Sequence, residues 1–367
     1  MKTINFNPCI SHTYDDCARN PCIIRTYEKH GGRGSPLLQN CANVYAIEGK
    51  TSISGYERKP AGSLALTGSV VFSPKLFWRG ERMFQNNLLA GRTIFLTGGG
   101  TGLGRSMALR TAALGAKLFL VGRREDPLRE TAQAIRAAGG VCGYATADVR
   151  DFAAVEAAVA AAEGELGRVD TLINNAAGNF IARTEKISPN AFAAVVGIVL
   201  HGTFHCTQAL GRKWIASGKS GTVLNIVTTY AAANCGSAYI VPSAAAKAGV
   251  LAITRSLAVE WARYNIRLIA IAPGPFPTEG AWSRLMPSKE FEEHARSTHP
   301  MKRFGRHEEL ANLAAFLLSD GAGYINGECV VIDGAQWLRG AGEFNDLVDL
   351  PESVWERMEA GRKTGGK

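Results

Sequence analysis

The chain has 367 residues, 46% of them hydrophobic and 20% charged, a composition that excludes a fibrous or wholly disordered protein. The formal net charge is +9, but Lys and Arg are scattered and no basic block alternates with aromatic residues, so the charge indicates small anionic ligands and no nucleic acid. We also expect no membrane span. No uninterrupted apolar run reaches the roughly 18 residues required, and Glu156 interrupts the Ala-rich stretch 153–162.

Residues 1–85 have no sustained helical or strand periodicity and contain clusters of Gly, Ser and Pro, which predicts a poorly ordered N-terminal extension. This segment has no apolar signal-peptide core, and acidic residues such as Asp15 and Glu28 are atypical of a mitochondrial transit peptide. The last residues of the chain do not match a peroxisomal signal. We therefore expect a cytoplasmic protein, with a mitochondrial location as the alternative. A further interpretation makes Met83 the start of translation.

The eight cysteines do not form a disulfide pattern. Those of the later chain are dispersed through apolar segments and are expected to be reduced core residues: Cys142, Cys206, Cys235 and Cys329. The other four lie near the N-terminus beside two histidines: Cys9, Cys17, Cys22 and Cys41 with His12 and His30. Because none has the C-x-x-C spacing, a zinc site there is a minor alternative, and we expect no metal centre.

From residue 92 onward, short apolar runs alternate with amphipathic helical patterns, which is typical of βαβ units and a parallel sheet. We expect strands at 93–96, 117–121, 141–145, 171–174, 222–227, 267–272 and 329–332. Helices are expected to begin near Gly102, Pro127, Phe152, Pro189, Pro242 and His307. The pattern predicts an α/β fold, a Rossmann-type doubly wound parallel sheet, as a single domain over 86–338 with a C-terminal tail over 339–367.

A glycine-rich segment follows the first expected strand and opens the first expected helix: Thr97, Gly98, Gly99, Gly100, Thr101, Gly102, Leu103 and Gly104. In this context the glycine spacing predicts a dinucleotide-binding turn. Gly98 permits the sharp turn, Gly102 lets the backbone approach a pyrophosphate, and Gly104 lets the helix pack on the strand. The helix N-terminus supplies unpaired N–H groups and a positive dipole. A merely flexible glycine loop is the alternative, and the βαβ alternation disfavours it.

The second expected strand leads into Arg123 and Arg124, at the position where an NAD enzyme has an acid for the ribose 2′-hydroxyl. Two guanidinium groups there favour the 2′-phosphate of NADPH, because planar forks bind phosphate through paired hydrogen bonds. Surface arginines without a ligand are the alternative. Asp148, after the third strand, is a candidate for the adenine edge. Its alternative role is a helix N-cap, for which Asp151 is better placed.

Further motifs follow the later strands: NNAAGNF at 174–180, TTY at 228–230, VPSAAAK at 241–247, PGPFPT at 273–278, AWSR at 281–284 and GEFNDL at 342–347. With the glycine segment, these motifs resemble the short-chain dehydrogenase/reductase superfamily and, within it, the 2,4-dienoyl-CoA reductases. The resemblance implies a homotetramer that uses NADPH to reduce 2,4-dienoyl-CoA thioesters to enoyl-CoA in fatty acid β-oxidation. Binding NADPH and an acyl-CoA thioester would account for part of the positive charge.

One position departs from the wider superfamily, in which a tyrosine stands four residues before the catalytic lysine, on the same helix face. This chain has Ser243 four residues before Lys247. A serine hydroxyl is too short and too weakly acidic to replace a phenol as proton donor to an alkoxide, so simple ketone–alcohol chemistry is disfavoured. The dienoyl-CoA reductases share this serine and take their active tyrosine from the loop after the fifth strand. The matching residue here is Tyr230.

The resemblance assigns roles to the remaining candidates. Tyr230 and Asn179 would donate hydrogen bonds to the thioester oxygen of a dienolate, Lys247 would hold the nicotinamide ribose and stabilise an ionised phenol, and Ser243 would help fix the cofactor. Further cofactor contacts are implied at Asn175, Pro273, Gly274, Pro275 and Phe276, and substrate contacts at Arg123, Arg150, Phe180, Ser188 and Arg284. Without the motifs, several of these residues have ordinary alternatives: Lys247 as a solvated charge, Tyr230 as a packing residue, Asn179 as a turn residue, and Arg150 and Arg284 as solvent-exposed side chains.

Two further positions, at which the superfamily usually has Asn, carry His201 and Ile269 here. The first Asn supports a proton relay in the superfamily, so His201 is either an altered relay group or a core histidine bonded to a backbone carbonyl. Ile269 cannot form a side-chain hydrogen bond. Two other functions stay open. One is a different enoyl- or ketoacyl-thioester reductase of the superfamily, which the missing phenol at position 243 disfavours. The other is a catalytically inactive NADPH-binding scaffold.

Overall fold

The computed structural model describes residues 84–231, 236–278, 288–340 and 345–357, without the side chains of 346 and 348. Nearly all of the expected extension, the four N-terminal cysteines and Cys235 therefore lie outside the described residues. Burial raises the pKa of the Cys142 and Cys206 thiols to about 12, and both are free cysteines as expected.

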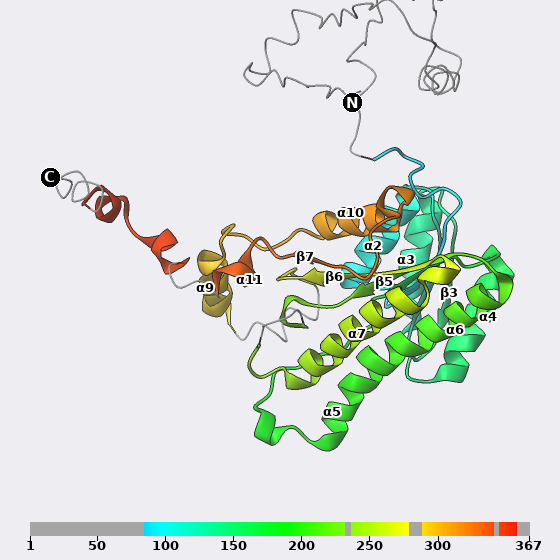
Figure 1. Cartoon of the computed structure of the whole chain (residues 1–367), viewed down its shortest axis with the longest axis horizontal. Helices are drawn as coiled ribbons and strands as arrows, with labels where there is room; N and C mark the ends of the chain where they lie inside the picture. The colour runs from blue at the N-terminus through cyan, green and yellow to red at the C-terminus, as the bar shows by residue number, and fades with distance from the viewer. Residues whose placement is uncertain (1–83, 232–235, 279–287, 341–344, 358–367) are drawn as a thin grey trace, which may run out of the picture. The chain divides into compact units, whose positions relative to one another are not determined.

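Seven parallel strands form one sheet in the order β3-β2-β1-β4-β5-β6-β7, which confirms the predicted Rossmann-type fold (Figure 1). The strands are β1 (Thr93–Thr97), β2 (Lys117–Gly122), β3 (Cys142–Thr146), β4 (Thr171–Asn174), β5 (Gly221–Ile226), β6 (Ile266–Pro273) and β7 (Cys329–Ile332). Every residue of β1, β4 and β5 is buried. Strands that are covered on both faces are rich in apolar residues, and this composition is why the sequence located them well.

Helices cover both faces of the sheet (Figure 1). They are α2 (Gly102–Ala113), α3 (Glu125–Ala137), α4 (Phe152–Leu166), α5 (Pro189–Val196), α6 (Gly202–Ser217), α7 (Val241–Glu260), α9 (Lys289–Thr298), α10 (His307–Leu318) and α11 (Gln336–Arg339). Successive strand residues point to opposite faces, so Leu96 packs in the cluster with α2, α3 and α10, whereas Phe95 packs in the cluster with α4 and α6.

The helices predicted to begin near Pro127 and Pro242 begin within two residues of those positions. α3 begins at Glu125, two residues before Pro127, because Pro127 fits the first turn of a helix without the amide hydrogen that it lacks. α7 begins at Val241, so that Pro242 again lies in the first turn. α9 was not predicted at all. None of its residues is buried, so the sequence gives no core-facing apolar stripe to mark it.

A long helical stretch, Pro189–Ser217, consists of α5, a π-helical turn at Gly197–His201 and α6. In the part of the chain that the structure describes, it is the one helix long and apolar enough to cross a membrane by length and composition, and 44% of its most apolar window is buried in the fold. Trp214 on α6 is 1% exposed, and its indole N–H donates to the carbonyl of Val169 at 2.7 Å. This helix is therefore part of the layer that covers the sheet.

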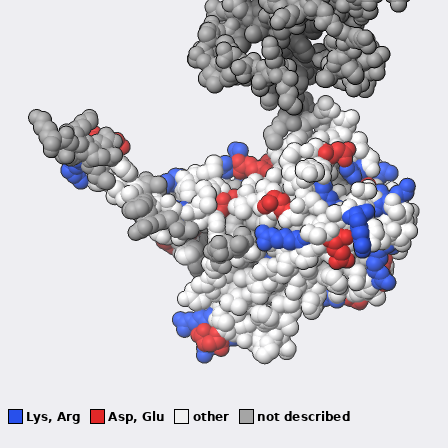
Figure 2. All heavy atoms as spheres, in the orientation of Figure 1, with Lys and Arg blue, Asp and Glu red and all other residues white. Residues whose placement is uncertain are grey.

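Acidic and basic side chains are intermixed on the face drawn in Figure 2, with a largely uncharged area over α5 and α7. The helices α5, α6 and α7 expose four large apolar side chains: Phe192, Phe204, Val241 and Val259. Val259 is the most exposed of them, at 82%.

Candidate active site

The predicted site residues meet at the edge of the sheet where β1, β4, β5 and β6 end. β1 leads into the glycine segment, β4 into Asn175, β5 into Tyr230 and β6 into Pro275. The chain builds β2 and β3 on one side of β1 and then returns to place β4 on the other side, so the strand order reverses at this edge. Ligands of open α/β sheets bind at such reversal points.

The glycine segment has the backbone geometry that its spacing predicts. Gly98 and Gly102 have φ angles of +68° and +54°, which residues with a side chain rarely adopt. A Cβ at Gly104 would overlap the carbonyl of Gly98, so close helix–strand packing requires glycine there. The side chain of Thr101, the N-cap of α2, makes no capping hydrogen bond. The first-turn amides of α2 therefore have no side-chain cap and suit an anionic group.

Asn175 holds this turn from the neighbouring strand. Its side-chain amide donates to the carbonyls of Thr97 at 3.1 Å and Gly98 at 3.2 Å. The Thr97 hydroxyl in turn accepts from the backbone amides of Asn175 and Ala176, each at 3.0 Å. The structure therefore gives Asn175 a role in positioning the glycine turn, which the sequence had described only as a cofactor contact.

Arg123 and Arg124 are both exposed at the end of β2. Asp148 lies close by, where the hydrogen bond from Arg150 lowers the pKa of its carboxyl group. Arg150 donates to Asp148 through Nε at 3.0 Å and through a terminal nitrogen at 2.5 Å. Asp148 was expected beside the adenine of the cofactor and Arg150 beside the substrate, but the two side chains form an ion pair with each other. Asp151 caps α4 through the amides of its first turn, so the alternative of Asp148 as the cap is wrong.

The Tyr230 hydroxyl lies 2.9 Å from Oγ of Ser243 and 3.5 Å from Nδ2 of Asn179, which donates to it. Ser243 is 1% exposed, on the first turn of α7, while Asn179 and Tyr230 are partly buried on the loops after β4 and β5. The carbonyl oxygen of Asn179 accepts from the backbone amide of Phe180 at 2.9 Å, which turns its NH₂ group toward the phenol. The structure therefore brings together a phenol and an amide that can donate to one oxygen atom.

Lys247 lies one turn further along α7 and is 6% exposed. Its ammonium group donates to the carbonyl of Ile226, at the end of β5. Burial lowers the pKa of Lys247 to about 8, because the interior solvates the charged form poorly. The buried cation therefore lies at the same edge of the sheet as the predicted phenol.

The residues assigned to substrate binding are less concentrated. Phe180 packs against the cluster formed by Val195, Val199 and their neighbours. The Ser188 hydroxyl accepts from the amide of Ala191 at 3.2 Å and so caps α5, a role that the sequence analysis did not consider. Arg284 lies outside the described residues, as do the AWSR motif and the first three residues of GEFNDL.

The segment after β6 is fixed by backbone contacts. The amide of Gly274 donates to Ile332 on β7, and the carbonyl of Pro275 accepts from Gly305, each at 3.0 Å. Phe276 is 7% exposed, and a cavity beside it is lined also by His299 and Met301.

Two departures from the superfamily can now be located. His201 is exposed at the end of the π-helical turn, so the interpretation as a core histidine is wrong. Its ring lies 6.4 Å from that of His205, which bonds the carbonyl of Val149. Ile269 is completely buried in the core against α2 and α10, on the strand that pairs with β5. Apolar packing explains an apolar residue at that position.

Thr228 was not singled out by the sequence analysis. Its hydroxyl is buried between β5 and Tyr230 and has no hydrogen-bond partner among the residues that the structure describes. A ligand at this edge could supply the missing partner. Together with the glycine turn and the buried Lys247, this hydroxyl makes the edge a suitable place for a dinucleotide, so the residues present fit the expected cofactor.

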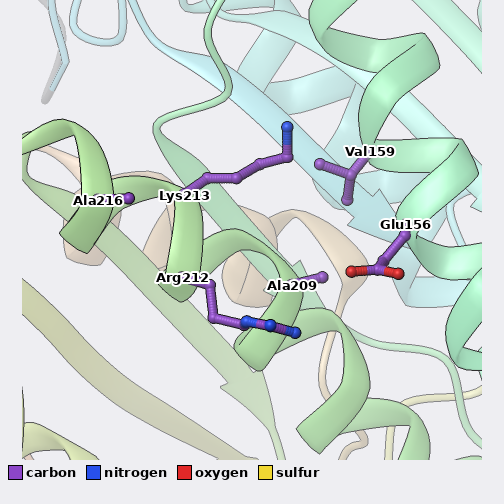
Figure 3. A pocket seen from close by; sticks show the side chains of 6 residues that line it. All are labelled: Glu156, Val159, Ala209, Arg212, Lys213 and Ala216. Carbon is purple, nitrogen blue, oxygen red and sulfur yellow. The ribbon is translucent and has the colours of Figure 1, made fainter.

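A second cavity lies between α4 and α6 and is lined by Glu156, Val159, Ala209, Arg212, Lys213 and Ala216 (Figure 3). None of the predicted site residues lines this cavity, so it is separate from the candidate site. Within the described ranges, no group of three or more His, Cys, Asp or Glu side chains could hold a metal ion.

Comparisons with known proteins agree with this geometry. A family model described as enoyl-(acyl carrier protein) reductase matches residues 98–335. A probable 2,4-dienoyl-CoA reductase of Bacillus subtilis is 46% identical over 249 residues, which cover 67% of this chain and 97% of that protein.

Two solved structures are also similar. A short chain dehydrogenase from Bacillus anthracis has a TM-score of 0.61 and 41% identity, covering 67% of this chain and 96% of that one. A gluconate 5-dehydrogenase from Burkholderia cenocepacia, in complex with NADP and tartrate, has a TM-score of 0.64 and 31% identity, covering 68% and 97%.

Proposed function

We propose a function for this chain that proceeds from its family: it belongs to the short-chain dehydrogenase/reductase family of oxidoreductases. The proposed reaction is the reduction of 2,4-dienoyl-CoA thioesters to enoyl-CoA with NADPH. The observation that carries the proposal is the cluster of Tyr230, Ser243 and Asn179 beside the buried Lys247. The family's usual phenol is replaced by Ser243, and a second phenol, from the loop after β5, lies within hydrogen-bond distance of that serine.

The proposed chemistry needs a site for negative charge. When bound, NADPH supplies a hydride to the far end of the conjugated diene, and charge moves onto the thioester oxygen as a dienolate. Tyr230 and Asn179 then donate hydrogen bonds to that oxygen. Two donors fixed before the reaction stabilise developing charge without reorganising. Protonation at carbon by water completes the reduction, so no side chain has to supply that proton.

The other residues prepare this arrangement. Ser243 holds the phenol through its 2.9 Å contact, and Lys247 supplies a positive charge for the ribose hydroxyls and for the phenol. The protonated form of Lys247 has three N–H donors and a positive charge, and so binds ribose hydroxyls more strongly than the neutral amine does. Because burial lowers the pKa of Lys247 to about 8, we expect cofactor binding to weaken as the pH rises through 8.

Replacing the phenol tests the proposed reaction. We expect Tyr230→Phe to lower kcat with a short 2,4-dienoyl-CoA by roughly 10²–10³-fold, because one oxyanion donor is lost, while the Kd of NADPH stays unchanged. Tyr324→Phe is the matched control, since Tyr324 is fully exposed. NADPH oxidation followed by absorbance measures both. Unimpaired turnover of Tyr230→Phe would contradict the assignment, and an inactive wild-type chain that still binds NADPH would support an inactive scaffold.

The choice of cofactor is tested at Arg123 and Arg124, which are exposed and which we propose to bind the 2′-phosphate of NADPH. We expect the wild-type protein to prefer NADPH to NADH. Changing both arginines to Ser should raise the KM for NADPH by about 10–100-fold, the worth of lost charge-assisted hydrogen bonds, and leave the KM for NADH nearly unchanged. Arg212→Ser, in the separate cavity, is the control. Equal use of the two cofactors by the wild-type protein would refute this argument.

We also propose a cytoplasmic homotetramer that acts in the β-oxidation of unsaturated fatty acids. The exposed Phe192, Phe204, Val241 and Val259 on α5, α6 and α7 are consistent with burial of this face between subunits. Arg150 and Arg284 would bind phosphates of coenzyme A, and Phe180 and Ser188 would lie beside the acyl chain. For Arg150 this requires that its pair with Asp148 open or share the ligand.

A further inference from the structure

The ring of His307, the first residue of α10, joins two segments that border the glycine turn. Its Nε2 atom lies 2.6 Å from the carbonyl oxygen of Pro277, after β6, and its Nδ1 atom lies 2.9 Å from the hydroxyl of Ser106 on α2. The same hydroxyl lies 3.2 Å from the carbonyl oxygen of Gly102. A chain of hydrogen bonds therefore runs from the segment after β6 to the glycine turn, through one imidazole and one hydroxyl.

The joined segments are also in direct contact. A Cβ atom at Gly102 would lie 3.3 Å from the methyl group of Thr278, the residue after Pro277. Further along the two helices, Nε of Arg110 on α2 donates to Oδ1 of Asn312 on α10 at 2.7 Å. The helices are thus held together away from the turn, and the His307 ring controls the contact nearest to it.

The protonation state of the ring decides how many of these hydrogen bonds can form. The carbonyl of Pro277 only accepts, so Nε2 carries a hydrogen in either state. In the neutral ring, Nδ1 accepts the single hydroxyl hydrogen of Ser106. The carbonyl of Gly102 then receives no hydrogen bond from this hydroxyl. In the imidazolium, Nδ1 donates to Ser106, whose hydroxyl then donates to Gly102. With the charged ring, all three hydrogen bonds from Pro277 to Gly102 form. With the neutral ring, the one from Ser106 to Gly102 is missing.

Charged residues of both signs lie on the helices that pack around the ring. The ionisable side chains of the packed elements are Arg105 and Arg110 on α2, and Arg306, Glu308 and Glu309 at the start of α10, whereas residues 275–278 have none. Glu309 is paired with Arg303 and Arg306. A pyrophosphate at the first turn of α2 would add negative charge near this chain of hydrogen bonds, which favours the imidazolium.

We infer that His307 is a positioning residue for the dinucleotide, and that it takes up a proton from solvent when the pyrophosphate binds at the start of α2. The imidazolium then fixes the spacing between the glycine turn and Pro277. This inference rests on the proposed function, because it requires a dinucleotide at this turn. By linkage, a ligand that binds with proton uptake binds more weakly as the pH rises.

Titration calorimetry of NADPH into the full chain, at one pH near 7 in buffers of different ionisation enthalpy, counts the protons taken up. We expect the wild-type protein to take up about half a proton more than His307→Gln, which corresponds to roughly a threefold increase in Kd per pH unit. Glutamine can still donate to Pro277 but cannot be protonated. The 2′-phosphate of NADPH contributes equally to every variant, so the differences between variants isolate the ring.

Two further variants separate the relay from a general charge effect. Ser106→Ala removes the acceptor that the imidazolium needs, and we expect it to lower the proton uptake as His307→Gln does. His294→Gln changes an exposed histidine on α9 and should leave the uptake unchanged. Equal uptake by the wild-type protein and His307→Gln overturns the inference. So does a loss of uptake in His307→Gln that Ser106→Ala does not share.

The two proposals can fail separately. If NADPH gives neither a heat of binding nor a rise in the unfolding temperature of the wild-type protein, the proposed function is wrong and this inference falls with it. If NADPH binds and only the proton count is the same in all variants, the inference alone is wrong.

Discussion

Lys247 places a charged ammonium group in the protein interior, and burial of this charge lowers the free energy of unfolding. The side chain is 6% exposed, and burial lowers its pKa to about 8. The unfolded chain has the ordinary lysine pKa of 10.5, so between pH 8 and 10.5 it binds more protons than the folded chain does. Stability therefore rises with pH across this interval, and the cost is fully present below pH 8.

Replacing this lysine with an apolar side chain of similar length should stabilise the protein while removing its activity. We expect Lys247→Met to raise the free energy of unfolding at pH 7 by up to about 3 kcal/mol, the worth of the pKa shift, and to lose turnover. Denaturant unfolding at pH 7 and pH 10 measures the difference between variant and wild type. That difference should shrink at pH 10, and a difference that does not depend on pH would contradict the assignment to charge burial.

At the scale of elements, the contact between β1 and α2 depends on the absence of a side chain at Gly104. A Cβ there would overlap the carbonyl of Gly98 and lie 2.5 Å from Nδ2 of Asn175. The same methyl group would therefore push the helix from the strand and displace the amide that holds the glycine turn.

We expect Gly104→Ala to destabilise the protein by about 1–3 kcal/mol, as overpacking does, and to weaken NADPH binding. Gly164→Ala is the matched control. Gly164 lies in α4 with no atom within 4 Å of the added methyl group, so the change should stabilise the helix by about 0.5–1 kcal/mol. Urea unfolding of the two variants compares them, and effects of the same sign would refute the packing argument.

The sequence predicted the strands of the sheet because β1, β4 and β5 are buried along their whole length, and each contains a short run of large apolar residues. It did not predict α9, whose residues are all at least partly exposed, nor the π-helical turn at Gly197–His201, which leaves no pattern in the order of residue types. Element type follows from local burial, whereas an exposed helix or a change of helical pitch depends on contacts distant in sequence.

The same distinction holds for the candidate site. The glycine turn could be predicted because positive φ angles at Gly98 and Gly102 are a local requirement. The resemblance assigned Tyr230 and Ser243 to the site, but their contact was not predicted, because it depends on how two segments 13 positions apart approach each other. The bridge formed by His307 and Ser106 could not be predicted, since the two residues are 201 positions apart and neither lies in a motif.

At the scale of the whole molecule, the chain divides into two units, Met1–Arg82 and Met83–Lys367. All predicted site residues belong to the second unit. We propose that this unit is the functional domain with its C-terminal tail, and that the first unit is not needed for folding or catalysis.

A chain that begins at Met83 should keep the unfolding temperature, the activity and the tetrameric mass of the full chain. The physical reason is that the described core clusters, which begin at Phe84, already join the seven strands to the helices that cover them. Thermal unfolding, NADPH oxidation and light scattering after size exclusion test the three properties. A shortened chain that fails to fold would show that the first unit contributes to stability.

The hydrogen bonds of Asn175 to Thr97 join residues 78 positions apart, and they require β4 to be paired with β1. During synthesis the glycine turn leaves the ribosome long before Asn175 does. The elements β2, α3, β3 and α4 are made between them. A nucleotide in the cell therefore cannot guide the early steps of folding, because its pocket does not yet exist. If the chain binds a dinucleotide as proposed, binding comes only after these distant strands have paired.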